Sequence, residues 1–121
     1  MQFALLVYES PEAFAARKSD GTDAYTGAWR AYHKALVESG AYVGGDPLEV
    51  PETGTIVRIK EGKRRVQDGP FADTKEQLGG FIIMELTSVD AALDWAARCP
   101  TASSGCVEVR PLAPAAKHRN T

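Results

Sequence analysis

Residues 68–81, DGPFADTKEQLGGF, concentrate rigid and charged chemistry in one short segment between two predicted strands. Gly69 has access to backbone angles that are closed to other residues, and Pro70 fixes its own φ and has no N–H donor. Such a corner would hold the Asp68 carboxylate in a fixed place and aim the ring of Phe71. Asp68 is therefore the first candidate for a functional carboxylate, as a general base or as an acceptor for a ligand. The alternative is that Asp68 only bonds nearby backbone N–H groups of the turn.

The polar residues that follow have the spacing of a capping box, with Thr74 at the cap and Gln77 three residues later. We expect one helical turn there, before the two glycines at 79–80 lead into a strand. On this hypothesis the polar side chains of the turn, Lys75 among them, face a ligand cleft together with Asp68.

A predicted helix at 23–39 carries the aromatic candidates. Tyr25, Trp29 and Tyr32 recur at three- and four-residue steps and so share one stripe. They could wall a ligand pocket or simply pack in the core. His33 lies about 100° round from that stripe, and its ordinary pKa of about 6.5 suits an acid or base. The alternative for His33 is a plain surface position.

Two more charged residues complete the candidate set. Asp46 stands on a bent backbone, after two glycines and before a proline, and could form a polar site if it approached Asp68. Arg58 interrupts an apolar strand pattern, so it could pair with Asp68 or hold a ligand carboxylate. The acids are too few and the histidines too isolated to predict a metal site. We also expect no cofactor, since no glycine loop precedes a helix to hold a phosphate.

The elements that must position these residues follow from hydrophobic periodicity and turn residues. Strands are expected at 2–8, 41–45, 55–59, 63–67, 81–86 and 106–111, and helices at 10–19, 23–39 and 89–99. This order predicts a ferredoxin-like βαββαβ fold of the α+β class with a hairpin inserted in its middle. Residues 1–112 are expected to form a single domain, and 113–121 a disordered tail.

The predicted central strands, FALLV and FIIM, are apolar on both faces, whereas two helices cover only one face of a sheet. The second face therefore needs a cover. A second copy of the chain is the simplest candidate, which predicts a homodimer; a large apolar ligand is the alternative.

Composition excludes several classes of protein. The 121 residues carry a net charge of −2, which does not favour nucleic-acid binding. No apolar run approaches the ~20 residues of a membrane helix, and the start MQFALLVYES does not have the basic region of a signal peptide. We therefore expect a cytoplasmic protein with no membrane partner. Cys99 and Cys106 do not have a metal-binding spacing and are expected to be free thiols in a reducing compartment. The alternative is a disulfide between them, since they flank a loop.

The segment DGPFADTKEQLGGF resembles the signature of the DGPF-domain proteins, a branch of the YCII-related family. The segments LLVYES, WRAYHKALVESGAYVGG, TIVRIKEGKRRVQDG, DAALDWAARCP and VEVRPL resemble the same family in order, so the likeness covers about residues 2–112. The resemblance implies a dimeric α/β barrel. In the broader YCII group a helix histidine and an aspartate are the suspected catalytic pair. That histidine aligns near Trp29 and not at His33, so the pair is not carried over to this sequence.

Three hypotheses follow. The first is a dimeric barrel with a small-molecule cleft at the DGPF loop, where Asp68 and His33 are the candidate catalytic residues. The other residues assigned to ligand binding are Tyr25, Trp29, Asp46, Arg58, Gly69, Pro70, Phe71 and Lys75. The second is an accessory protein without catalysis, linked by the resemblance to sigma-factor-dependent transcription. The third is a cofactor-free enzyme, as the related monooxygenases suggest.

Overall fold

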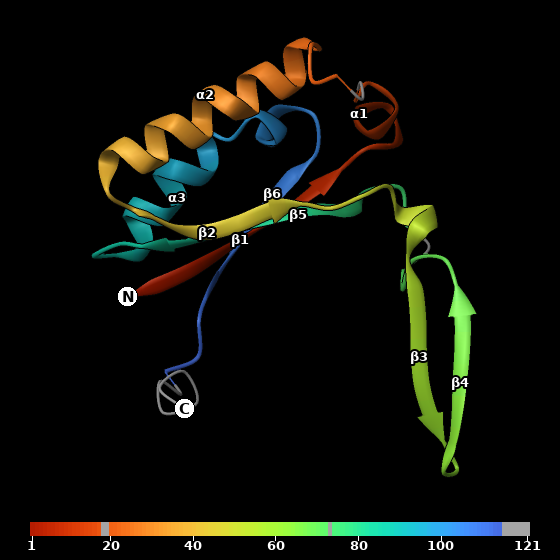
Figure 1. Cartoon of the computed structure of the whole chain (residues 1–121). Helices are drawn as coiled ribbons and strands as arrows, with labels where there is room; N and C mark the ends of the chain where they lie inside the picture. The colour runs from red at the N-terminus through yellow and green to blue at the C-terminus, as the bar shows by residue number, and fades with distance from the viewer. Residues whose placement is uncertain (18–19, 73, 115–121) are drawn as a thin grey trace.

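A four-stranded antiparallel sheet with helices on one face forms the body of the protein, and a separate hairpin projects from it (Figure 1). The computed structural model describes residues 1–17, 20–72 and 74–114. The elements are β1 (Gln2–Glu9), α1 (Pro11–Ala15), α2 (Ala24–Ser39), β2 (Tyr42–Pro47), β3 (Thr55–Lys60), β4 (Lys63–Asp68), β5 (Gln77–Glu85), α3 (Val89–Ala97) and β6 (Cys106–Pro111), with short 3-10 turns at Pro51–Thr53 and Pro100–Ser103. The sheet order is β2-β5-β1-β6, and β3 pairs only with β4. The predicted α+β class is confirmed.

Strand β1 shows why the sheet has one covered face. Its residues alternate between buried and half-buried, and the buried set is Phe3, Leu5, Val7 and Glu9. These side chains face the helices, since successive residues of a strand point to opposite sides. Leu5 lies opposite Ile82 of β5 and Val109 of β6, which therefore share its face.

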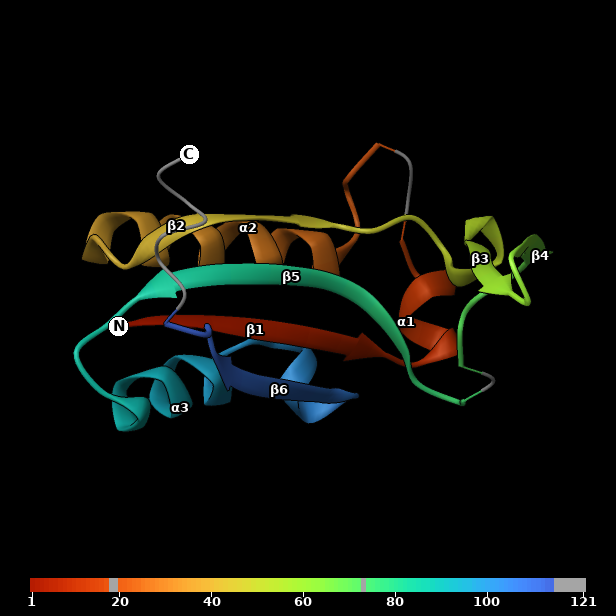
Figure 2. The ribbon, with the colours of Figure 1, turned by 90° about the horizontal axis from the view of Figure 1, so that it is seen from below.

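Helix α2 begins and ends where the sequence predicts. The Asp23 side chain accepts a hydrogen bond from the backbone N–H of Thr26, and Gly40 ends the helix with φ at 82°. The helix buries Tyr32 and Leu36 against the sheet. Figure 2, seen from below, shows α2 and α3 behind the same side of the sheet.

The other face of the sheet has no helix over it in the described chain (Figure 2). Ala4, Leu6 and Tyr8 of β1 point to it, and all three are only half-buried. Phe81 and Ile83 of β5 lie opposite Leu6 and Ala4 and extend the same surface. The apolar character predicted for both sheet faces is therefore present.

Several boundaries differ from the predicted ones. Strand β5 begins at Gln77 instead of residue 81, because Gly80 pairs with Val7 and with Pro47. The predicted helical turn at 74–77 is wrong: the Gln77 amide donates to the carbonyl oxygens of Ala72 and Thr74, at 2.6 and 2.8 Å, and ties a bend instead.

The ends of several other elements also differ. The first helix ends at Ala15, four residues before the predicted boundary, and β2 continues to Pro47. Most of the predicted disordered tail, residues 115–121, lies outside the described residues. Both cysteines are free, Cys99 buried and Cys106 exposed. Among the described residues, no helix combines the length and the hydrophobicity needed to cross a membrane.

Candidate functional site

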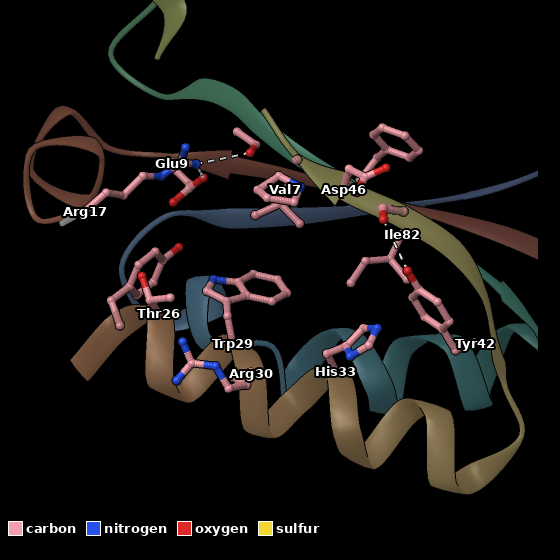
Figure 3. A pocket seen from close by; sticks show the side chains of 16 residues that line it. Val7, Glu9, Arg17, Thr26, Trp29, Arg30, His33, Tyr42, Asp46 and Ile82 are labelled. Carbon is pink, nitrogen blue, oxygen red and sulfur yellow. Dashed lines mark hydrogen bonds and ion pairs between the residues drawn. The ribbon is translucent and has the colours of Figure 1, made fainter. Parts of the chain in front are cut away.

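A cavity of about 400 Å³ lies between α2 and the covered face of the sheet (Figure 3). This volume falls within the range of small-molecule sites. Helix α2 supplies one wall through Tyr25, Thr26, Trp29, Arg30 and His33. The sheet supplies the opposite wall, which includes Val7, Glu9, Tyr42 and Ile82. Much of this lining is apolar or aromatic. Its charged members are Glu9, Arg17, Arg30 and Asp46, of which Glu9 is the buried one.

Glu9 occupies a position that the strand pattern reserves for an apolar residue. It follows Phe3, Leu5 and Val7 on the covered face of β1 and is only 2% exposed. A buried carboxylate is costly unless it is paired. The Arg17 guanidinium provides that pairing, with its Nη2 2.5 Å from Glu9 Oε1.

Arg17 is itself fixed by three acceptors. Besides Glu9, its guanidinium donates to the backbone carbonyl oxygen of Gly79 at 3.1 Å and to that of Leu48 at 2.5 Å. Gly79 also makes room for the carboxylate, because a Cβ at this position would overlap Glu9 Oε1 and come within 2.7 Å of Glu9 Cδ. Glu9 on strand β1 can therefore hold this position because residue 79 on strand β5 is a glycine.

The second carboxylate oxygen of Glu9 differs from the first in its hydrogen bonding. Glu9 Oε2 is buried and has no hydrogen-bond partner among the described residues. The nearby Tyr25 hydroxyl is already bonded to the Thr101 hydroxyl. Burial raises the pKa of Tyr25 to about 12, with a smaller contribution from the Glu9 carboxylate. Tyr25 therefore stays protonated near neutral pH.

Aromatic rings from α2 form most of the remaining wall. The Trp29 ring meets Tyr25 and Tyr32 edge to face, at centroid distances of 6.5 and 5.4 Å. This geometry is favourable for aromatic pairs and holds the indole in place. At the outer end of the cavity His33 meets the Tyr42 ring edge to face at 4.6 Å, and His33 is exposed. The Tyr42 hydroxyl donates to the Gly45 carbonyl oxygen at 3.1 Å and braces that rim.

The structure brings together four of the predicted site residues, since Tyr25, Trp29, His33 and Asp46 all line the cavity. Asp46 differs from the other three in orientation. It lies opposite Phe81, so the strand register assigns its side chain to the helix-free face.

The DGPF segment meets this cavity only through its last three residues, Gly79, Gly80 and Phe81, whereas the described residues of the DGPF loop, 68–78, do not line it. Asp68 is exposed at the end of β4, opposite Thr55, and Lys75 is exposed as well. Gly69 has the predicted unusual backbone, with φ at 104°. Pro70 and Phe71 line a separate hollow of about 530 Å³, which also includes Tyr8 and Leu78.

That second hollow has open walls, because Pro70 is exposed and the Phe71 ring is 77% exposed. Of the two roles considered for Arg58, the pairing with Asp68 is not among the ion pairs of the described residues. Arg58 lies opposite Arg65 in the hairpin, and its guanidinium lies 5.4 Å from the centre of the Phe71 ring. A functional role for Asp68 stays a prediction. Asp68 does not line the α2 cavity.

Sequence reasoning missed Glu9 and Arg17, the two charged residues deepest in the site. One signal was available: Glu9 continues the alternation of Phe3, Leu5 and Val7, which predicts an inward-facing carboxylate. Arg17 gave no comparable signal. Within the ranges 1–17, 20–72 and 74–114, no group of three or more His, Cys, Asp and Glu side chains is arranged to hold a metal ion.

Fold and site together define a small α+β domain with a helix-to-sheet cavity. The chain belongs to the YCII-related domain family, whose model matches residues 1–116. The resemblance seen in the sequence is thereby confirmed.

The chain is also similar to one curated relative and to one solved structure. The uncharacterized protein R00369 of Rhizobium meliloti (strain 1021) is 37% identical over 116 residues, 93% of each chain. Among solved structures, the chain resembles 5-chloro-2-hydroxyhydroquinone dehydrochlorinase (TftG) from Burkholderia phenoliruptrix AC1100, in complex with 2,5-dihydroxybenzoquinone. The TM-score is 0.57 and the identity 22%, with 98% of each chain covered. At this identity the likeness shows a shared fold.

Proposed function

We propose that this protein binds a small, flat organic molecule in the cavity between α2 and the sheet. The observation that carries the proposal is the cavity itself: about 400 Å³, walled by aromatic rings, with a buried glutamate paired to a half-buried arginine at its inner end. Apolar walls with a few placed polar groups are typical of ligand sites. The solved neighbour, in complex with 2,5-dihydroxybenzoquinone, lends support as an example of this fold holding a flat ring.

A thermal-shift screen of small metabolites would test this proposal. A compound that binds only the folded protein raises its melting temperature, by the equivalent of about 2.7 kcal/mol at a hundredfold excess over the dissociation constant. We expect hits among flat ring compounds, and we expect Trp29→Ala to abolish their shifts. Asp68→Asn is the matched control, because Asp68 lies outside the cavity. Hits that respond to Asp68→Asn and not to Trp29→Ala would contradict the proposal.

We further propose that the protein is a homodimer whose sheets pack through their helix-free faces, forming an α/β barrel. Ala4, Leu6, Phe81 and Ile83 supply the apolar surface that a second copy would bury. Leu6→Glu would place a charge at the centre of that interface. Light scattering should then report a dimer for the wild type and a monomer for the variant; a monomeric wild type would overturn this arrangement.

A second candidate function is protein interaction through the β3–β4 hairpin. The observation in its favour is the exposure of three apolar side chains on this isolated ribbon: Val57 is 59%, Ile59 69% and Val66 54% exposed. In that case the partner would be a protein, such as a transcription regulator, and binding would survive substitutions in the α2 cavity.

A further inference from the structure

The unpartnered Glu9 oxygen carries an inference about which ligand the cavity accepts. Glu9 Oε1 is occupied by Arg17, whereas Glu9 Oε2 is buried in the cavity lining without a donor from the described chain. A buried polar atom without a partner is unfavourable, and native structures rarely keep one without a reason. A side chain at position 79 would overlap the Glu9 carboxylate, so Gly79 leaves the space that the carboxylate fills.

Two described donors lie beside Glu9, the Arg17 guanidinium and the Tyr25 hydroxyl, and each also has a partner other than Glu9 Oε2. The Tyr25 hydroxyl is bonded to Thr101, and the Arg17 guanidinium reaches Glu9 Oε1, the Gly79 carbonyl oxygen and the Leu48 carbonyl oxygen. The cavity therefore offers a ligand one strong acceptor at its inner end, close to the Trp29 indole and its aromatic neighbours (Figure 3). A deprotonated ligand acid at this place would have no proton to donate to Oε2 and would face a carboxylate that Arg17 already pairs through Oε1.

We propose that Glu9 is a specificity-determining residue that selects flat ring ligands bearing a hydroxyl donor. On this model a ring lies against Trp29, and its phenol or enol hydroxyl donates a hydrogen bond to Glu9 Oε2. Arg17 is a positioning residue, because it fixes the carboxylate through Oε1 and leaves Oε2 to the ligand. This inference rests on the proposed ligand-binding function and names the chemical class of the ligand.

Three matched probes test the inference on the intact protein. They are resorcinol, which has two hydroxyl donors; 1,3-dimethoxybenzene, which has the same ring without donors; and benzoate, which brings a negative charge. Binding is measured by titration of ¹⁵N-labelled protein, following the Trp29 indole N–H. Ligands of this size are expected to bind in the millimolar range. We expect resorcinol to bind at least about tenfold more tightly than the other two, because a hydrogen bond to a charged acceptor is strong.

Glu9→Gln should reverse this selectivity. Arg17 only donates, so it would keep the amide oxygen and leave the amide nitrogen, a donor, where Oε2 stood. Resorcinol should then lose about tenfold or more in affinity and benzoate should gain. Glu108→Gln is the control, because Glu108 is bonded to Arg110 outside the cavity and its substitution should leave all three affinities unchanged. Circular dichroism establishes that each variant is folded.

The outcomes separate the inference from the proposed function. If all three probes move the Trp29 signal with equal affinity, the cavity binds rings but Glu9 does not select them, and the inference falls while the function stands. If the wild type prefers resorcinol and Glu9→Gln fails to fold, the preference alone supports the inference. If no probe saturates the Trp29 signal, both the inference and the proposed function are overturned.

Discussion

The α2 cavity and the DGPF loop differ in how well the sequence indicates a functional site. The loop has a conspicuous sequence, yet Asp68 and Lys75 are exposed and the Phe71 ring is 77% exposed. The cavity takes most of its lining from segments outside that motif, and it contains a glutamate that is only 2% exposed. The comparison teaches that the residue types most typical of a site need not lie where the fold encloses space.

The same contrast extends to what holds each region together. Strands β1, β5 and β6 share a core with α2 and α3, whose members include Leu5, Leu36 and Met84. In the part of the chain that the structure describes, strands β3 and β4 pair with each other and with no further strand. An isolated two-stranded ribbon is at best marginally stable in water. We therefore expect substitutions in the two regions to differ strongly in their effect on unfolding.

The largest expected effect compares one aliphatic side chain from each region. Leu36→Ala should lower the free energy of unfolding by about 2–5 kcal/mol, because Leu36 is fully buried. Ile59→Ala should change it by less than about 0.5 kcal/mol, because Ile59 is 69% exposed. Urea denaturation of both variants measures the difference. A large loss of unfolding free energy in Ile59→Ala would show that the hairpin is covered in solution. The two regions would then not differ in the way described.

A medium effect is expected at the glycine that gives Glu9 its space. Gly79→Ala should cost about 1–3 kcal/mol, since the added methyl overlaps the carboxylate and forces it away from Arg17. Gly44→Ala is the matched control on the neighbouring strand, because a Cβ there meets nothing within 4 Å. Thermal unfolding of the two variants decides the point. Equal melting temperatures would mean that Glu9 relaxes freely and is not held by its surroundings.

The smallest effect concerns the two thiols and alkaline pH. Burial raises the pKa of Cys99 to about 12, whereas an unfolded thiol ionises near pH ~8.5. Between these values the unfolded chain releases a proton that the folded chain keeps, so stability falls as the pH rises. Tyr25 contributes in the same direction, because its pKa is also raised to about 12.

Cys99→Ala should therefore lose less stability than the wild type when the pH is raised from ~8 to ~10. Cys106→Ala should follow the wild type more closely, because the Cys106 side chain is exposed. Melting temperatures of the three proteins across this range provide the measurement. If the two variants show identical slopes, the burial of Cys99 does not control its ionisation.

The sequence predicted the body of the fold well for reasons that are local. Helix α2 was predicted at 23–39 from its aromatic stripe and lies at Ala24–Ser39, with Asp23 as its cap. Strand β6 was predicted with the bounds Cys106–Pro111 that the structure has. Strand β5 was predicted to begin too late, because glycines have weak strand propensity by themselves. Here Gly79 and Gly80 belong to the strand, a result set by the neighbouring strand β1 and not by local preference.

The site could be predicted only in part. The aromatic wall came from helical spacing, which placed Tyr25 and Trp29 on one stripe. The partnership of Glu9 with Arg17 and with Gly79 joins residues from separate elements, and no spacing in one sequence encodes such a contact. The emphasis on Asp68 came from a rigid turn, and rigidity says nothing about whether the turn faces a cavity.

The most direct test of the central claim uses the two tryptophans as internal reporters. Trp29 lines the α2 cavity, whereas Trp95 lies on α3 and does not line it. Resorcinol is titrated into ¹⁵N-labelled protein while both indole N–H signals and the amide signals of Gly79 and Gly69 are followed. We predict that the Trp29 and Gly79 signals move and that those of Trp95 and Gly69 do not. If the amide signals of Gly69 and its neighbours in the loop shift while the Trp29 signal does not, the ligand binds at the loop and not in the α2 cavity. That result would contradict the proposed site.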